Sequence, residues 1–228
     1  MKTIKLLAAT AALTVSSVAV AGPNYTYAQL GFYTADSQGK EDTGGFVLRG
    51  SYGEDIFHVG AGIASGEYDG GRSKQSDDAN EFGADTDAYE LYAGVNPAIN
   101  DNIDAVVRVG YTAGEFKGRN AGDNYKVEDE ALFLSFGTRA MITEKFELNA
   151  FATYSAGNTK IEGGVDDDGD SKADFVEWSY TVGGIYSFTD MFAAGIKLEL
   201  ENNRQIAGDV EGSPTIGNIG TLFARVNF

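Results

Sequence analysis

The sequence contains no cysteine, one histidine and only 3 prolines in 228 residues. Without cysteine the chain folds without disulfides, so it depends on packing or on closed backbone hydrogen bonding. Basic residues are also scarce, because 17 Lys and Arg stand against 34 Asp and Glu. We therefore expect no nucleic-acid partner, since phosphate binding needs a basic surface. Beyond the N-terminal stretch there is no run of 18 apolar residues, which argues against a helical membrane protein.

Residues 1–21 have the three parts of a secretory signal peptide. Lys2 and Lys5 give a basic start, an apolar stretch follows, and the small-residue sequence AVA ends at Ala21. We therefore expect export and one domain over 22–228, with 15 basic and 34 acidic side chains and a net charge of −19. The alternative, an uncleaved transmembrane anchor, fits less well because the apolar stretch is short and rich in Ala, Thr and Ser.

Glycine and aromatic residues are abundant, with 30 Gly, 14 Phe and 12 Tyr, and this composition is typical of an all-β protein. Ten segments alternate between apolar and mixed residues, as a strand with two different faces requires. In the last segment Leu222 and Val226 share one face, Thr221 and Arg225 share the other, and the chain stops on the aromatic Phe228. The ten segments are 25–34, 45–52, 56–64, 88–96, 103–113, 131–140, 146–155, 176–186, 191–201 and 221–228.

The connections between these segments differ in length. Those after even-numbered segments are short, as at 53–55 and 187–190, whereas those after odd-numbered segments are long and polar, as at 65–87, 114–130 and 156–175. Transmembrane barrels combine short periplasmic turns with longer extracellular loops, and in lipid the sheet must close to pair its backbone. We therefore predict an antiparallel up-and-down transmembrane β-barrel of ten strands, or of eight if two segments are loop hairpins. A water-soluble barrel or sandwich would show the same alternation with its apolar face inward.

Three stretches carry a resemblance to a known group of proteins: GFVLRGSYGEDIFHVGAGIA, GVNPAINDNIDAVVRVGYTAGEF and ITEKFELNAFATYS. Together with the closing aromatic residue, they make the chain similar to the small Ax-type, OmpA-sized outer-membrane β-barrel proteins of Gram-negative bacteria. The resemblance implies a barrel in the cell outer membrane whose terminal aromatic is part of the signal read by the barrel-assembly machinery. It implies no shared chemistry.

Charged side chains occur on the mixed faces of the segments and on none of the apolar faces. Long side chains of opposite charge should pair across the lumen and fill it, because a lumen of about ten strands is only slightly wider than its side chains. We therefore predict a salt-bridged interior with at most a thin water path, and the alternative is a narrow selective pore. The predicted lumen charge network consists of Arg49, Glu90, Asp104, Arg108, Arg139, Glu147, Glu177, Lys197, Glu199 and Arg225.

The single histidine bears on whether the protein is an enzyme. A hydrolytic site needs a group that moves a proton, and His58 is the one imidazole available. Barrel hydrolases hold such a site near the outer rim, whereas His58 follows the short connection 53–55 at the opposite, periplasmic end. We therefore expect His58 to be a hydrogen-bonded lumen residue and the protein not to be an enzyme.

The stretch DDDGDSKADFVE has part of the spacing of a calcium-binding loop. Asp166, Asp168, Asp170 and Asp174 stand at ligand positions, and hard Ca²⁺ prefers such oxygen ligands. Ser171 stands where the turn of such a loop requires glycine, and no helices are expected on either side. A solvated acidic loop is therefore the simpler interpretation, and calcium is the one cofactor that the sequence suggests.

The expected role is structural or surface-interaction work at the Gram-negative envelope. The expected partners are outer-membrane lipid, lipopolysaccharide, and the barrel-assembly machinery during biogenesis, and the barrel is expected to be a monomer. The alternative is a narrow porin-like channel for small solutes. A hydrolase at the outer rim is the least supported of the three, because of the position of His58.

Overall fold

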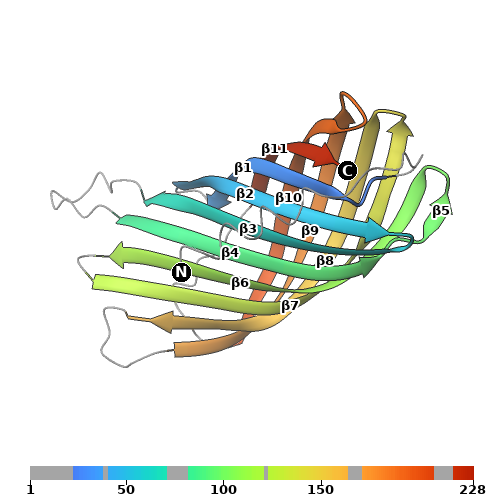
Figure 1. Ribbon diagram of the computed structural model, residues 1–228. Helices are drawn as coiled ribbons and strands as arrows, with labels where there is room; N and C mark the ends of the chain where they lie inside the picture. Colours follow the sequence, from blue (N-terminus) through green and yellow to red (C-terminus); the bar gives the residue numbers. More distant parts are fainter. Residues whose placement is uncertain (1–22, 38–40, 71–81, 121–122, 164–170, 208–217) are drawn as a thin grey trace.

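The computed structural model describes residues 23–37, 41–70, 82–120, 123–163, 171–207 and 218–228 (Figure 1). The predicted signal peptide lies outside these residues. Within them no helix is long and apolar enough to cross a membrane. The strands are β1 (Tyr27–Ser37), β2 (Glu41–Glu54), β3 (Phe57–Gly70), β4 (Phe82–Val95), β5 (Ala98–Asn100), β6 (Ile103–Asn120), β7 (Asp123–Thr143), β8 (Phe146–Glu162), β9 (Ser171–Ser187), β10 (Phe192–Ala207) and β11 (Ile219–Asn227).

The strands form one closed antiparallel barrel. Wall strands that follow one another in the chain pair with each other, and the pairing of β1 with β11 closes the ring. The short β5 pairs with β6 inside the connection between β4 and β6, so ten strands form the wall. The prediction of a ten-stranded up-and-down barrel is confirmed, and the eight-stranded alternative is wrong. Closure leaves the wall without an open sheet edge, as a sheet in lipid requires.

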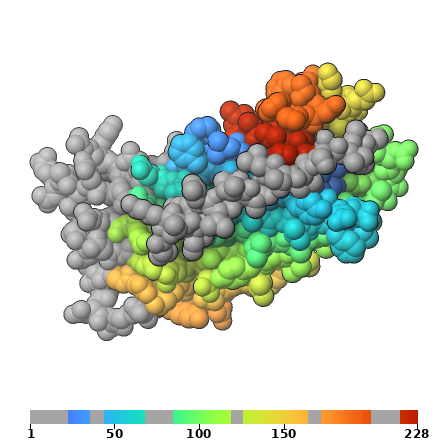
Figure 2. All heavy atoms as spheres, viewed as in Figure 1, coloured from blue at the N-terminus to red at the C-terminus, as the bar shows by residue number. Residues whose placement is uncertain are grey.

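The apolar face of the wall points outward. Leu132 is 65 % exposed and Ile196 58 % exposed, whereas Arg139 on the opposite face is only 3 % exposed. Figure 2 shows part of this outer surface, over β2, β3, β4 and β6. This arrangement is the reverse of a water-soluble barrel, so that alternative is wrong. Other apolar side chains that face outward are Leu30, Phe46, Val59, Leu91, Val109, Leu134, Val182, Leu198 and Leu222.

The two ends of the barrel differ. At one end, which we call the turn end, short connections join β2 to β3, β4 to β6, β7 to β8 and β9 to β10. The C-terminus also lies there (Figure 1), and the backbone N–H of Phe228 donates to the carbonyl of Thr26 over 3.0 Å. At the other end, which we call the hairpin end, β1 leads to β2, β3 to β4, β6 to β7, β8 to β9 and β10 to β11.

Several strands extend further toward the hairpin end than the sequence analysis predicts. The antiparallel register of β6 and β7 continues to the pair Asn120 and Asp123, through most of the predicted loop 114–130. In the same way β8 and β9 occupy much of the predicted loop 156–175. These two loop predictions are wrong over most of their length. The physical reason is that strand pairing continues beyond the apolar band, where the outward face no longer has to be apolar and the alternation fades.

Candidate functional site

A partly open cavity of about 320 Å³ lies inside the barrel. Its wall combines charged and polar side chains with the rings of Phe133, Phe151 and Phe223. Asp104 of the predicted lumen charge network is buried but does not line the cavity. The other nine members of that network line it: Arg49, Glu90, Arg108, Arg139, Glu147, Glu177, Lys197, Glu199 and Arg225.

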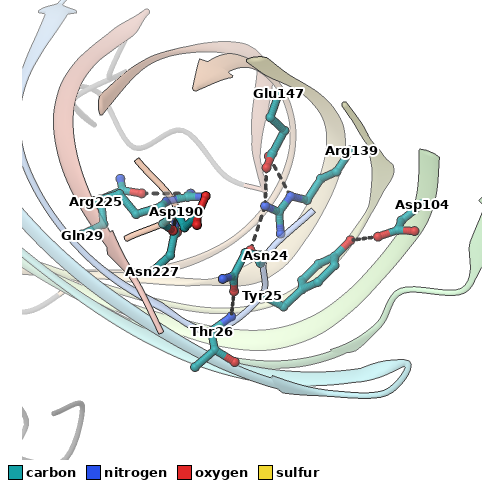
Figure 3. A network of polar contacts seen from close by, with 10 residues as sticks. All are labelled: Asn24, Tyr25, Thr26, Gln29, Asp104, Arg139, Glu147, Asp190, Arg225 and Asn227. Carbon is teal, nitrogen blue, oxygen red and sulfur yellow. Dashed lines mark hydrogen bonds and ion pairs between the residues drawn. The ribbon is translucent and has the colours of Figure 1, made fainter. Parts of the chain in front are cut away.

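A bidentate ion pair joins Arg139 on β7 to Glu147 on β8 inside the turn end (Figure 3). Arg139 donates from Nε to one carboxylate oxygen over 2.8 Å and from Nη2 to the other over 2.6 Å. The same Nη2 donates to the backbone carbonyl of Asn24 over 2.9 Å. Bidentate charge-assisted hydrogen bonds are among the stronger ones in proteins, and both of these side chains are buried. The pair therefore fixes the N-terminal segment to the barrel wall.

Residues 23–26 precede β1, and of these Asn24, Tyr25 and Thr26 are seen inside the turn end (Figure 3). The hydroxyl of Tyr25 donates to the Oδ2 atom of Asp104 over 3.0 Å, and the guanidinium of Arg139 lies 4.2 Å from the centre of the Tyr25 ring. A phenol is protonated at neutral pH, so the Tyr25 hydroxyl is the donor to Asp104. This segment thus places an aromatic side chain across the interior.

His58 on β3 is 2 % exposed and has both ring nitrogens engaged. Arg108 donates its Nε–H to His58 Nε2 over 3.1 Å, and His58 Nδ1 lies 2.9 Å from the Oδ1 atom of Asn96. Because arginine has no acceptor, Nε2 must carry the lone pair and Nδ1 the proton that is donated to Asn96. The Tyr25 ring lies 5.0 Å from the imidazole ring. We call Tyr25, His58, Arg108, Arg139 and Glu147 the floor of the interior.

Two glycines make room for the rings beside the floor. A Cβ atom on Gly94 would lie 2.6 Å from the His58 ring, and one on Gly60 would lie 2.3 Å from the ring of Tyr92. Gly94 pairs with His58 across β4 and β3, so a larger residue there would displace the imidazole from Arg108. Glycine at these positions therefore serves close packing inside the barrel.

Above the floor the charged residues pair less tightly. Lys197 donates to Glu199 on the same strand over 2.8 Å, whereas Arg49 Nε lies 4.0 Å from Glu90. Arg225 on β11 has the ring of Tyr27 3.9 Å from its guanidinium carbon. The interior thus contains tight pairs, a loose pair and an arginine that rests on an aromatic ring.

The two chemical predictions, a calcium site and the absence of enzymatic activity, both stay predictions. Asp166, Asp168 and Asp170 lie outside the described residues, and Asp174 is exposed on β9. In the described part of the chain no group of three or more His, Cys, Asp or Glu side chains could hold a metal ion, so the calcium site stays a prediction. The position of His58 at the turn end agrees with the sequence analysis, and the absence of enzymatic activity also stays a prediction.

Sequence reasoning missed two parts of this interior. The predicted segment 25–34 includes Tyr25 and Thr26, but the sequence analysis gave Tyr25 no role in the interior, and residues 23–24 lie before that segment. The inward aromatic residues Tyr92 and Phe223 belong to the mixed faces of their strands, but the predicted lumen network contains only charged residues. A useful signal is a glycine on the neighbouring strand, as Gly195 is for Phe223, because its missing Cβ leaves space for a ring.

A family comparison agrees with this geometry. The model of the outer membrane protein beta-barrel domain matches residues 6–159, more than half of the chain. The chain belongs to this family. Members of the outer membrane protein beta-barrel domain family lie in the outer membrane, and so does this barrel. The expected resemblance to small outer-membrane barrels of Gram-negative bacteria is confirmed.

Solved structures of other outer-membrane barrels resemble this one at low identity. The outer membrane protease OmpT from Escherichia coli is 11% identical with a TM-score of 0.49, over 90% of this chain and 94% of that chain. The translocator domain of autotransporter NalP from Neisseria meningitidis is 12% identical with a TM-score of 0.49, over 99% and 92%. The attachment invasion locus protein Ail of Yersinia pestis is 10% identical with a TM-score of 0.42, over 90% and 97%. No curated protein sequence matches the chain.

Proposed function

We propose that this outer-membrane barrel has a structural or surface-interaction role and that its floor closes the interior to solutes. The observation that carries the proposal is the buried Arg139–Glu147 pair with Tyr25 packed against it. A lumen of about ten strands is only slightly wider than its side chains, so a few long side chains in one layer can fill it. By the usual orientation of such barrels, the turn end with this floor faces the periplasm.

The hairpin end supplies the surface for interaction. β7 has 21 residues, and at about 3.4 Å per residue and a tilt of about 45° it rises about 50 Å, twice the apolar band of about 25 Å. Lys126 on β7 forms ion pairs with Glu115 on β6 and with Glu128. The β6–β7 hairpin therefore projects beyond the bilayer as paired strands, and it would meet lipopolysaccharide or an external partner.

The proposed partners follow from this position. The apolar outer face meets outer-membrane lipid, and the closing strand β11 with Phe228 meets the barrel-assembly machinery during biogenesis. We propose a monomer, because closure already pairs the wall strands. We also propose that the protein is not an enzyme, since His58 is buried and both of its ring nitrogens are engaged.

One observation favours a second candidate, a narrow channel for small solutes. The cavity above the floor is lined by charges of both signs, as a selective pore would be. For conduction, ions would have to pass the side chains of Tyr25, Arg139 and Glu147. The two candidates therefore differ in one property, whether the floor conducts.

Single-channel recording in planar bilayers decides between them. We expect no steady conductance from the wild-type barrel and ohmic steps from a barrel in which Tyr25→Ala, Arg139→Ala and Glu147→Ala are combined. Lys145→Ala, in an exposed turn, is the matched control and, like wild type, should show no steady conductance. Steps of equal size from wild type and from the combined variant would overturn the closed floor and support the channel. Should the combined variant not fold, Tyr25→Ala alone opens part of the same layer.

A further inference from the structure

Arg225 is a buried charge of the interior that has no carboxylate partner among the described residues. It is 7 % exposed and lines the cavity from β11. Its Nη2 donates to Gln29 Oε1 over 3.3 Å, and its Nε is buried with no acceptor among the described residues. The rings of Tyr27 and Phe223 lie 3.9 and 5.7 Å from its guanidinium carbon. Aromatic rings stabilise a cation only in part, and a buried charge without a counter-ion is costly.

Among the described residues no carboxylate forms an ion pair with Arg225. Glu147 accepts hydrogen bonds from Arg139 with both of its carboxylate oxygens. Glu199 accepts from Lys197 on its own strand. Arg225 lies close to the turn-end limit of β11, whereas Asp129 and Glu177 stand in the hairpin-end halves of β7 and β9. Positive charge is therefore in excess around Arg225.

A second arginine faces the same space without a carboxylate. Arg108 donates its Nε–H to His58. Its guanidinium lies 4.5 Å from the ring centre of Phe151 and 5.0 Å from that of Tyr92. Among the described residues no carboxylate oxygen lies within ion-pair distance of it. The part of the cavity nearest the floor thus combines two arginines that lack a carboxylate with aromatic walls.

We propose that the cavity binds a small organic anion, a carboxylate with an apolar or aromatic body. Arg225 binds the carboxylate, with Arg108 adding positive charge, and rings such as Phe133 and Phe151 contact the apolar body. A volume of about 320 Å³ lies within the range of small-ligand sites, and the wall combines mainly charged and polar side chains with several aromatic rings. This inference goes beyond the proposed structural role, since a binding site in the cavity needs no conduction through the floor.

Isothermal titration calorimetry of the whole protein in detergent micelles tests the site, with benzoate as the probe. Benzoate should bind saturably, and the isosteric neutral benzamide should bind at least tenfold more weakly because it lacks the charge for Arg225. Acetate, which has the carboxylate without the ring, should also bind more weakly. Equal binding of acetate and benzoate would overturn the apolar part of the site, and equal binding of benzamide would overturn the role of the charge.

Variants locate the binding. Arg225→Gln should weaken benzoate binding at least tenfold, whereas Lys145→Gln in an exposed turn should leave it unchanged. Arg49→Gln removes a cavity arginine that already faces Glu90, so its effect should be clearly smaller. Undiminished binding by Arg225→Gln, or no saturable binding of benzoate by wild type, would overturn the proposal. Should Arg225→Gln not fold, the comparison of benzoate with benzamide on wild type decides. These binding outcomes do not depend on whether the floor conducts. The anion-binding proposal and the closed-floor proposal can therefore each be overturned without the other.

Discussion

Arg108 on β6 donates its Nε–H to His58 Nε2 on β3 over 3.1 Å, across the intervening strand β4. The bond sets the protonation of the imidazole, because only a lone pair on Nε2 can accept it. The proton then belongs to Nδ1, which faces the Oδ1 atom of Asn96, and the Nδ2 atom of Asn96 lies 3.4 Å from the backbone carbonyl of Asp55. One arginine is thus connected through His58 and Asn96 to the turn between β2 and β3.

The first prediction concerns this tautomer. Nitrogen-15 NMR of the folded protein in micelles at neutral pH should show the neutral form of His58, with Nδ1 protonated and Nε2 unprotonated. The chain has a single histidine, so a protein without a histidine tag gives one imidazole signal that needs no assignment. The urea-unfolded chain supplies the reference spectrum. A proton on Nε2 in the folded protein would contradict the bond from Arg108.

The second prediction concerns the space beside the same ring. Gly94→Ala places a Cβ 2.6 Å from the imidazole of His58 and 2.6 Å from the backbone oxygen of Val107, so the ring and the neighbouring strand must both shift. Overpacking of this kind costs about 1–3 kcal/mol of unfolding free energy. Gly50→Ala is the matched control, since its Cβ meets only a backbone oxygen at 3.8 Å. Urea titration followed by the fluorescence of Trp178, the single tryptophan, measures both. Equal stability of the two variants would show that the ring is not held as described.

The sequence predicts the wall of this barrel well because each wall residue obeys a local rule. Lipid outside and a mixed interior impose alternation on every strand, so Leu132 and Arg139 can be assigned to faces from their positions alone. The rule ends where the bilayer ends, and for this reason the loop predicted over 114–130 is mostly strand.

The interior depends on closure, which no local pattern contains. The contact of Arg139 with Glu147 on the next strand follows from strand register, so it is predictable from the sequence. The contact of Arg108 with His58 across β4 depends on the curvature of the closed wall. The contact of Tyr25 with Asp104 depends in addition on where residues 23–26 lie. The sequence therefore predicts which charges point inward and leaves their partners open.

The third prediction tests the coupling of the floor pair. Removing either Arg139 or Glu147 leaves a buried charge without its partner, so each single alanine variant should lose about 3–5 kcal/mol of unfolding free energy. The double variant should lose less than the two single losses together, by about 1–3 kcal/mol. The partly exposed pair Lys160 and Glu162 is the control, where single variants should cost much less than at the buried pair. Strict additivity for Arg139 and Glu147 would contradict a buried, coupled pair.

The fourth prediction tests the bilayer itself, through two isoleucines that differ in depth and hardly in exposure. Ile196 lies at the centre of the apolar outward positions of β10, which run from Phe192 to Leu200, and is 58 % exposed. Ile142 lies beside the β7–β8 turn and is 56 % exposed. If the outer face of the barrel were in contact with water, an arginine would be tolerated equally at both positions. In a membrane barrel, Ile196→Arg should cost about 2–4 kcal/mol and Ile142→Arg at most about 1 kcal/mol, because the cost of a charge falls from the midplane to the interface.

Folding of the two variants into phospholipid vesicles, followed by urea titration, measures this difference. Ile196→Ala corrects for the lost side chain, so the remaining loss reports the charge alone. The same two arginine variants in detergent micelles should differ less, since a micelle is thinner and adapts around a charge. Equal costs in vesicles would mean that the apolar band of this wall does not lie in hydrocarbon, whatever its alternation.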